Sequence, residues 1–157
     1  MPRAPIPNPP YRGGCLCGAV RYRIDAKPRA LNACHCMDCK KLSGATHIVM
    51  AIVDTDAFAH EAGELVRWRK TADSGREVDI VRCAQCGVRL WHEPLANPEF
   101  RFVAMGTLDD PSWTEPTSHI WLSRVSPGVY VHEDAYQADV QPLSRQVLID
   151  AFSKHHG

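Results

Sequence analysis

The sequence predicts a mainly β protein with antiparallel sheets and a short C-terminal helix. Three observations lead to this fold class. Short runs of four to eight residues, rich in β-branched and aromatic side chains, alternate with turn-forming residues along most of the chain. The runs follow one another at regular spacing, which is typical of an antiparallel all-β domain. A longer stretch of apolar residues at helical spacing occurs near the C-terminus.

The strands are predicted from two kinds of pattern. Apolar and basic residues alternate in residues 19–24, so Val20, Tyr22 and Ile24 share one face of a strand. Residues 47–53 form a nearly continuous apolar run, as expected for a strand that is buried on both faces. The other predicted strands lie at residues 64–70, 77–83, 88–93, 99–106, 118–124 and 128–132.

Two helices are predicted. Residues 39–45 form a helical turn that ends near Gly44. Residues 142–156 form an amphipathic helix that begins at Ser144 or at the proline before it. Its apolar residues are Leu143, Val147, Leu148, Ala151 and Phe152. We expect this helix to pack on the β body, and the alternative is a contact between two copies in a homodimer.

The chain divides into three parts. Residues 1–12 are predicted to be a flexible arm, because five of the first ten residues are prolines. Residues 13–135 form a single β domain, and residues 136–157 form a tail that is mostly helical.

Charge and hydropathy exclude some classes of protein. Lysine plus arginine equals aspartate plus glutamate, 18 each, so a general nucleic-acid binder with its basic excess is not expected. No run approaches the ~18 apolar residues that a membrane-spanning helix needs, and no secretory signal opens the chain. We therefore expect a cytoplasmic protein with no nucleic-acid or membrane partner.

The seven cysteines carry the chemistry. Cytoplasmic thiols stay reduced, and an odd number of clustered cysteines favours metal ligation over disulfides. Every cysteine belongs to a C-x-C or C-x-x-C group, spacings that bring sulfurs close enough to share a tetrahedral zinc ion. The three groups are Cys15 with Cys17, then Cys34, Cys36 and Cys39, and finally Cys83 with Cys86.

These groups predict two zinc ions per chain. Two pairs make a closed four-thiolate site, Cys15, Cys17, Cys83 and Cys86, which is the ligand set of a structural zinc. The remaining three, Cys34, Cys36 and Cys39, leave one position open, which is the pattern of a catalytic zinc.

Several alternatives stay open for the ligands. An iron–sulfur cluster also takes four thiolates. His35 or His47 could close the three-cysteine site, although an extended segment would point His35 away from its two neighbouring cysteines. Lys40 and Lys41 could offset the negative charge of three thiolates or hold the carboxylates of a substrate.

Other candidate residues carry less weight. His119 could act as a general base, but a histidine hydrogen-bonded in the core is the stronger interpretation. The four tryptophans, Trp68, Trp91, Trp113 and Trp121, are expected to serve mainly in the core.

The chain resembles the glutathione-dependent formaldehyde-activating enzyme family, which includes centromere protein V. The matching stretches are GGCLCGAVRY, CHCMDCKKLSGA, CAQCGVRL, GTLDDPS and HIWLSR, and they span Gly13 to about Arg124. The tail from Tyr136 onward lies outside the resemblance. After HIWLSR the family often has a Pro-Trp pair, whereas here Pro127 is followed by Gly128.

The resemblance implies a β-tent zinc-binding fold. It also implies that Cys15, Cys17, Cys83 and Cys86 hold a structural zinc, and that Cys34, Cys36 and Cys39 hold a second, catalytic zinc. No further catalytic residue is assigned. The implied activity is that of a carbon–sulfur lyase, an S-hydroxymethylglutathione synthase-like enzyme that acts on an adduct of a small thiol such as glutathione with formaldehyde. The alternative is a non-enzymatic, zinc-stabilised binding module for a protein partner.

Overall fold

The computed structural model describes residues 2–72 and 74–157, and it contains two β-sheets and two α-helices. The smaller sheet has the order β1–β2–β5, with β1 at Tyr11–Gly14, β2 at Arg21–Ile24 and β5 at Phe58–Ala62. The larger sheet has the order β11–β10–β3–β4–β9–β8–β7–β6. Its strands are β3 (Ala30–Cys34), β4 (Ile48–Asp54), β6 (Leu65–Thr71), β7 (Glu77–Cys83), β8 (Arg89–Pro94), β9 (Phe100–Ala104), β10 (Ser118–Ile120) and β11 (Tyr136–Gln137).

The helices are short. The first, α1 (Met37–Ser43), follows β3, and the second, α2 (Gln146–His156), ends the chain. Three 3₁₀ turns lie at η1 (Thr55–Ala57), η2 (Met105–Thr107) and η3 (Leu122–Arg124). No described helix has the length and the apolar composition that crossing a membrane requires.

The predicted fold class is confirmed: the protein is mainly β, with a short C-terminal helix. Strand direction is the main difference. The sequence pattern predicts antiparallel sheets, but β10 pairs in parallel with both β3 and β11. Burial periodicity is the same for either direction, because side chains alternate between the two faces in both kinds of strand. The larger sheet is therefore mixed.

Individual elements follow the sequence pattern closely in the middle of the chain. The apolar run 47–53 corresponds to β4, whose Met50–Val53 segment is buried, and the run 77–83 corresponds to β7. Helix α1 ends at Gly44, which has φ of +65° and donates its N–H to the Lys40 carbonyl. Residues 128–132 form no strand, so that prediction is wrong.

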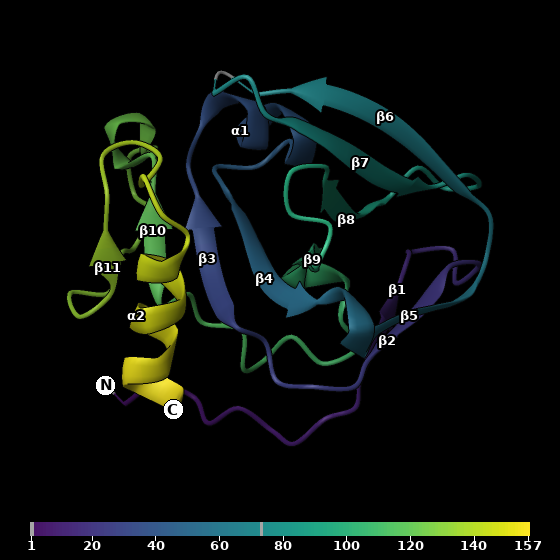
Figure 1. The fold of residues 1–157 in the computed structure, drawn as a ribbon, viewed down its shortest axis with the longest axis horizontal. Helices are drawn as coiled ribbons and strands as arrows, with labels where there is room; N and C mark the ends of the chain where they lie inside the picture. The colour runs from purple at the N-terminus through teal and green to yellow at the C-terminus, as the bar shows by residue number, and fades with distance from the viewer. Residues whose placement is uncertain (1, 73) are drawn as a thin grey trace.

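The core lies between the two sheets. Figure 1 shows that the larger sheet is curved and that the small sheet lies away from the end that carries β10 and β11. Three aromatic rings join the sheets. Tyr22 of β2 lies 5.5 Å from Phe58 of β5 and 6.0 Å from Trp91 of β8, and Phe58 lies 4.8 Å from Trp91 between ring centroids. Tyr22 and Trp91 are almost fully buried, so their contacts supply much of the apolar contact between the sheets.

At the opposite end, α2 packs beside β3, β10 and β11 (Figure 1). Leu148 and Phe152 are its buried residues, as the amphipathic pattern predicts. Leu143 lies before the helix and is fully exposed, so the helix begins later than the sequence pattern indicates.

The N-terminal arm is joined to the end of the chain. Arg3 donates a hydrogen bond of 2.7 Å to the Pro116 carbonyl and forms an ion pair of 2.5 Å with Asp134, while its side chain is only 6% exposed. His155 of α2 lies 3.7 Å from the same carboxylate. Asp134 thus brings residues from both ends of the chain together.

Candidate metal centres and the adjoining pocket

The four-cysteine cluster lies where the two sheets meet at their turns. Cys15 and Cys17 follow β1, whereas Cys83 ends β7 and Cys86 lies in the turn before β8. Their sulfurs all lie within 4.8 Å of one another. The measured separations of 3.5 Å for Cys15–Cys17 and 3.8 Å for Cys17–Cys83 are close to the ~3.8 Å between two thiolates on one tetrahedral zinc ion.

Backbone groups orient these sulfurs. The N–H of Val20 donates to Cys15 Sγ at 3.2 Å, and the N–H of Cys86 donates to Cys83 Sγ at 3.4 Å. Gly87 has φ of +77°, which lets the chain turn tightly after Cys86. Hydrogen bonds from backbone N–H groups, first that of Val88, lower the pKa of Cys86 to about 6. Such bonds favour the thiolate form of Cys86, and the short distances between the four sulfurs fit a metal ion.

The three-cysteine cluster is built at the junction of β3 and α1. Cys34 is the last residue of β3, Cys36 precedes the helix, and Cys39 lies in its first turn. The Cys36 sulfur accepts a hydrogen bond of 3.3 Å from the N–H of Cys39. The three sulfurs also lie within 4.8 Å of one another, so this cluster could hold a metal ion with three protein ligands.

The three thiols lie so close together that each one changes the pKa of the other two. Hydrogen bonds from the thiols of Cys34 and Cys39 lower the pKa of Cys36 to about 2. The bond with Cys36, followed by burial, raises the pKa of Cys34 to about 12, and bonds with Cys34 and Cys36 raise the pKa of Cys39. Ionisation of one thiol therefore opposes ionisation of the other two, and a bound divalent cation would favour ionisation of all three.

His35 is not a fourth ligand in this arrangement. It is fully buried, and its Nε2 lies 2.9 Å from Nδ1 of His119. Its ring stacks between those of His47 and His119, with centroids 4.8 Å and 5.2 Å away. Among the described residues, the group of possible ligand atoms within 4.8 Å of one another contains the three sulfurs and no histidine nitrogen.

The rings of His35, His47 and His119 lie next to one another. His119 is 4% exposed, and burial, followed by the charges of the neighbouring histidines, lowers its pKa to about 4. It is therefore neutral at pH 7. Its burial and its hydrogen bond to His35 agree with the stronger sequence interpretation, a histidine hydrogen-bonded in the core.

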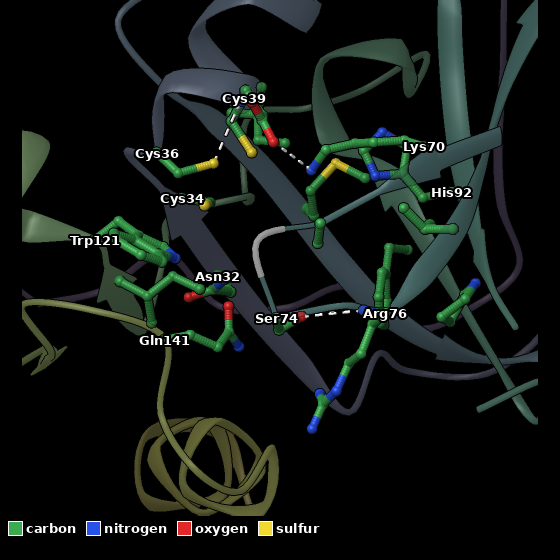
Figure 2. A pocket seen from close by; sticks show the side chains of 18 of the residues that line it. Asn32, Cys34, Cys36, Cys39, Lys70, Ser74, Arg76, His92, Trp121 and Gln141 are labelled. Atoms are coloured by element: carbon green, nitrogen blue, oxygen red, sulfur yellow. Dashed lines mark hydrogen bonds and ion pairs between the residues drawn. The ribbon is translucent and has the colours of Figure 1, made fainter. Parts of the chain in front are cut away.

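A cavity of about 290 Å³ opens in front of the three-cysteine cluster. Cys34, Cys36 and Cys39 all line it, whereas no residue of the four-cysteine cluster does. Figure 2 shows the three cysteines at one end of the labelled pocket residues and Ser74 and Arg76 at the other. The open side of this cluster thus faces a space large enough for a small ligand.

One face of the larger sheet forms the floor of the cavity. Asn32 of β3 pairs in register with Met50 of β4, and Ile52 of β4 pairs with Phe102 of β9, which pairs in turn with His92 of β8. All five side chains line the cavity. The opposite face carries Trp91 and the core, so a single sheet separates the packed interior from the pocket.

Lys70 of β6 compensates the negative charge of the cluster. Its ammonium lies 2.8 Å from Asp38 of α1, and its side chain is 16% exposed. Burial acts to lower the pKa of Lys70, but the bond to Asp38 and the charges of Cys36 and Cys39 outweigh it, and the pKa is raised. Lys70 is therefore held as a cation beside the sulfurs.

The two lysines predicted for this role lie elsewhere. Lys40 donates a hydrogen bond to the carbonyl of Arg124, and Lys41 is exposed. Neither lines the cavity. A helix places successive residues about 100° apart, so Lys40 and Lys41 lie about 100° and 200° around α1 from Cys39, away from the face that Cys39 shares with the pocket.

Trp121 forms a wall of the pocket in a strained conformation. It has φ of +59° and ψ of +40°, the left-handed region that side chains other than glycine rarely adopt. Its backbone carries the chain from β10 into η3, and its side chain lies beside the three cysteines (Figure 2). Such strain persists where the surroundings enforce it, often at a binding site.

Comparison with known proteins assigns the chain. A family model described as glutathione-dependent formaldehyde-activating enzyme matches residues 10–124. The chain belongs to this family. Among solved structures it is similar to a crystal structure of a Rhodobacter sphaeroides protein, at 22% identity and a TM-score of 0.49, covering 62% of this chain and 87% of that one. No curated protein matches it.

As a member of the glutathione-dependent formaldehyde-activating enzyme family, the chain has all seven cysteines inside the matched region. Sequence reasoning grouped these cysteines as the structure does. It missed Lys70, and it placed Trp121 in the core with the other tryptophans. The sequence pattern that bears on Lys70 is the alternation in the run 64–70. This alternation places Lys70 on the same face of β6 as Val66 and Trp68.

Proposed function

We propose that this chain is a zinc-dependent enzyme that joins a small thiol such as glutathione to formaldehyde, and that it cleaves the same carbon–sulfur bond in reverse. The observation that carries the proposal is the three-cysteine cluster with its open side on the cavity. Membership of the family supports the choice of thiol and aldehyde. The reaction class is that of a carbon–sulfur lyase.

The two clusters receive different roles in this proposal. Cys15, Cys17, Cys83 and Cys86 hold a structural zinc, and Cys34, Cys36 and Cys39 hold the zinc at which the reaction takes place. Zinc on three thiolates would supply an open position at which a substrate thiol loses its proton.

The reaction balances without a redox step. A carbon–sulfur bond forms between the thiol and the aldehyde carbon, the carbonyl π bond breaks, and the proton of the thiol ends on the resulting hydroxyl. Three thiolates on a divalent zinc leave a net charge of −1, and a fourth would make it −2. The Lys70 ammonium, held by Asp38 beside Cys36 and Cys39, offsets this charge.

The pocket walls orient the reactants. Trp121 presents an aromatic surface beside the sulfurs, and the apolar floor of Met50, Ile52 and Phe102 excludes water from the bound thiol. His92 accepts a hydrogen bond of 3.0 Å from Arg89. Burial, followed by the charge of Arg89, lowers the pKa of His92 to about 3, so it stays neutral.

The test is the rate of exchange between free and adduct forms of isotopically labelled formaldehyde in the presence of glutathione, measured by magnetisation-transfer NMR. The protein is expected to accelerate this exchange beyond the spontaneous rate, and Cys36→Ser is expected to abolish the acceleration. An exchange rate equal to the spontaneous one, in protein shown to hold two zinc ions, would instead favour a binding module.

A further inference from the structure

The wall of the pocket includes residues that lie beyond the matched family region. The family model ends at residue 124, but Gln141, Arg145 and Leu148 line the same cavity as the three cysteines. They belong to α2 and to the segment that leads into it. The family match therefore does not cover the part of the pocket that these residues form.

Arg145 is held over the pocket floor by two contacts. Its Nη1 donates a hydrogen bond of 2.8 Å to the Asn97 side-chain oxygen, and its guanidinium carbon lies 4.9 Å from the centre of the Phe102 ring. Asn97 and Phe102 also line the cavity. A guanidinium has five N–H donors, and one bond to Asn97 leaves most of them available to a ligand.

Two more arginines, Arg76 and Arg124, line the cavity. Arg76, from the turn between β6 and β7, lines it at the end away from the cysteines (Figure 2). Burial first, and then the charge of Arg76, lower the pKa of Arg145. Within residues 2–72 and 74–157, the ion pairs between side chains include neither arginine. The half-buried Arg145 and the exposed Arg76 thus line the same space, whose lining also includes the carboxylate of Glu77.

We propose that Arg145, together with Arg76, binds a carboxylate of the substrate, so that this protein selects thiols bearing an anionic group remote from the sulfur. This rests on the proposed function, because the thiol end is assigned to the three-cysteine cluster. An arginine fork binds a carboxylate in a bidentate manner and with strong directionality.

The binding test uses S-methylglutathione, which keeps both carboxylates but has no free thiol to coordinate a metal. Affinity is measured by calorimetry on the zinc-loaded protein, with the dimethyl ester of the same peptide as the uncharged comparison ligand. Arg145→Gln is expected to weaken binding of S-methylglutathione about tenfold to a hundredfold, in line with the loss of a charge-assisted hydrogen bond. Binding of the diester is expected to stay within twofold.

Two further variants separate recognition from folding. Arg145→Lys keeps the charge but loses the fork, and it is expected to recover part of the affinity. Arg29→Gln is the matched control, because Arg29 pairs with Asp54 outside the cavity and is not expected to affect either ligand. Thermal melts of all variants show whether α2 stays docked.

The inference is overturned if Arg145→Gln binds S-methylglutathione as tightly as the unaltered protein, if it weakens both ligands equally, or if the unaltered protein does not bind S-methylglutathione. A separate titration distinguishes failure of the proposed function from failure of this inference. Titration of cobalt-substituted protein with neutral 2-mercaptoethanol tests the three-cysteine cluster alone. If the thiolate-to-cobalt bands do not change while S-methylglutathione still depends on Arg145, the proposed function fails and the anion site stands.

Discussion

The two cysteine clusters use the same ligand atom in opposite surroundings. The four-cysteine cluster sits on the turns after β1 and β7, where Cys17 and Cys86 are exposed to solvent. A cavity of about 280 Å³ lies beside it, but that cavity is lined by Ala19, Glu64, Ala84 and Gln85 and by none of the four cysteines. Each cluster has two buried cysteines, Cys15 and Cys83 in the first and Cys34 and Cys39 in the second, but only the second cluster lines the cavity of about 290 Å³. Exposure of the residues is therefore a poor guide to which cluster meets a ligand.

Ligand number and neighbouring groups distinguish the clusters better. Four sulfurs complete a tetrahedron, and the backbone N–H bonds around Cys15 and Cys83 only orient them. Three sulfurs leave a position open, and here a cation, Lys70, stands beside them. The first cluster joins two sheets, and the second presents its open side to the floor of one sheet.

The largest expected effect is that of Cys83→Ser on folding. This change removes a ligand from the site that joins the β1–β2 turn to the β7–β8 turn, and structural zinc sites contribute on the order of 10 kcal/mol to folding. The variant is expected to lose its cooperative thermal transition, measured by circular dichroism. A melting temperature close to that of the unaltered protein would show that this cluster does not hold the sheets together.

Cys36→Ser is expected to distinguish the role of the three-cysteine cluster from that of the four-cysteine cluster. It removes a ligand from the site beside the cavity, so metal content is expected to fall from two zinc ions per chain to one, measured by elemental analysis. The melting temperature is expected to fall much less than in Cys83→Ser, since β3 and α1 are also held by the core. Equal unfolding of the two variants would mean that both sites are structural.

Lys70→Met tests whether charge compensation is specific to the three-cysteine cluster. Loss of a group next to metal ligands typically lowers metal affinity about tenfold to a hundredfold. That loss is expected at the second zinc alone, measured by competition with a chromophoric chelator. Lys41→Met is the matched control, because Lys41 is exposed and lies outside the cavity. Equal losses of zinc affinity in the two variants would show that the effect comes from the overall charge of the protein and not from the position of Lys70.

The smallest expected effects are those of two glycine substitutions, one beside each cluster. Gly87 has φ of +77° and Gly44 has φ of +65°, and an added Cβ meets nothing within 4 Å at either position. Alanine at either position should therefore cost only the backbone strain of about 1 kcal/mol. For a protein of this size that lowers the melting temperature by about 2–4 °C, measured by calorimetry. A much larger loss at Gly87 alone would show that its turn is coupled to metal binding.

The sequence predicts local features of this molecule well. Cysteine spacing indicates both clusters, because a C-x-C or C-x-x-C segment fixes sulfur positions within a few residues. The apolar run 47–53 indicates a buried strand, and the helical spacing of Leu148 and Phe152 indicates their burial on α2. Each of these features is decided by neighbours in the chain.

Features decided by distant segments are not predicted. The parallel pairing of β10 with β3 joins residues more than 80 positions apart and leaves no trace in periodicity. Lys70 reaches Asp38 across the cavity only because β6 curves over α1, and Arg145 reaches the floor because α2 docks beside β3. The strained Trp121 is likewise set by the fold around it.

The meeting of Arg3 and His155 at Asp134 has a consequence for protein engineering. The two ends of the described chain lie close to each other (Figure 1), on a carboxylate that is not part of the cavity lining. Termini arranged in this way tolerate circular permutation. A short linker between the ends would allow the chain to be opened beside the pocket instead, giving a permuted protein in which ligand entry can be altered without touching either cysteine cluster.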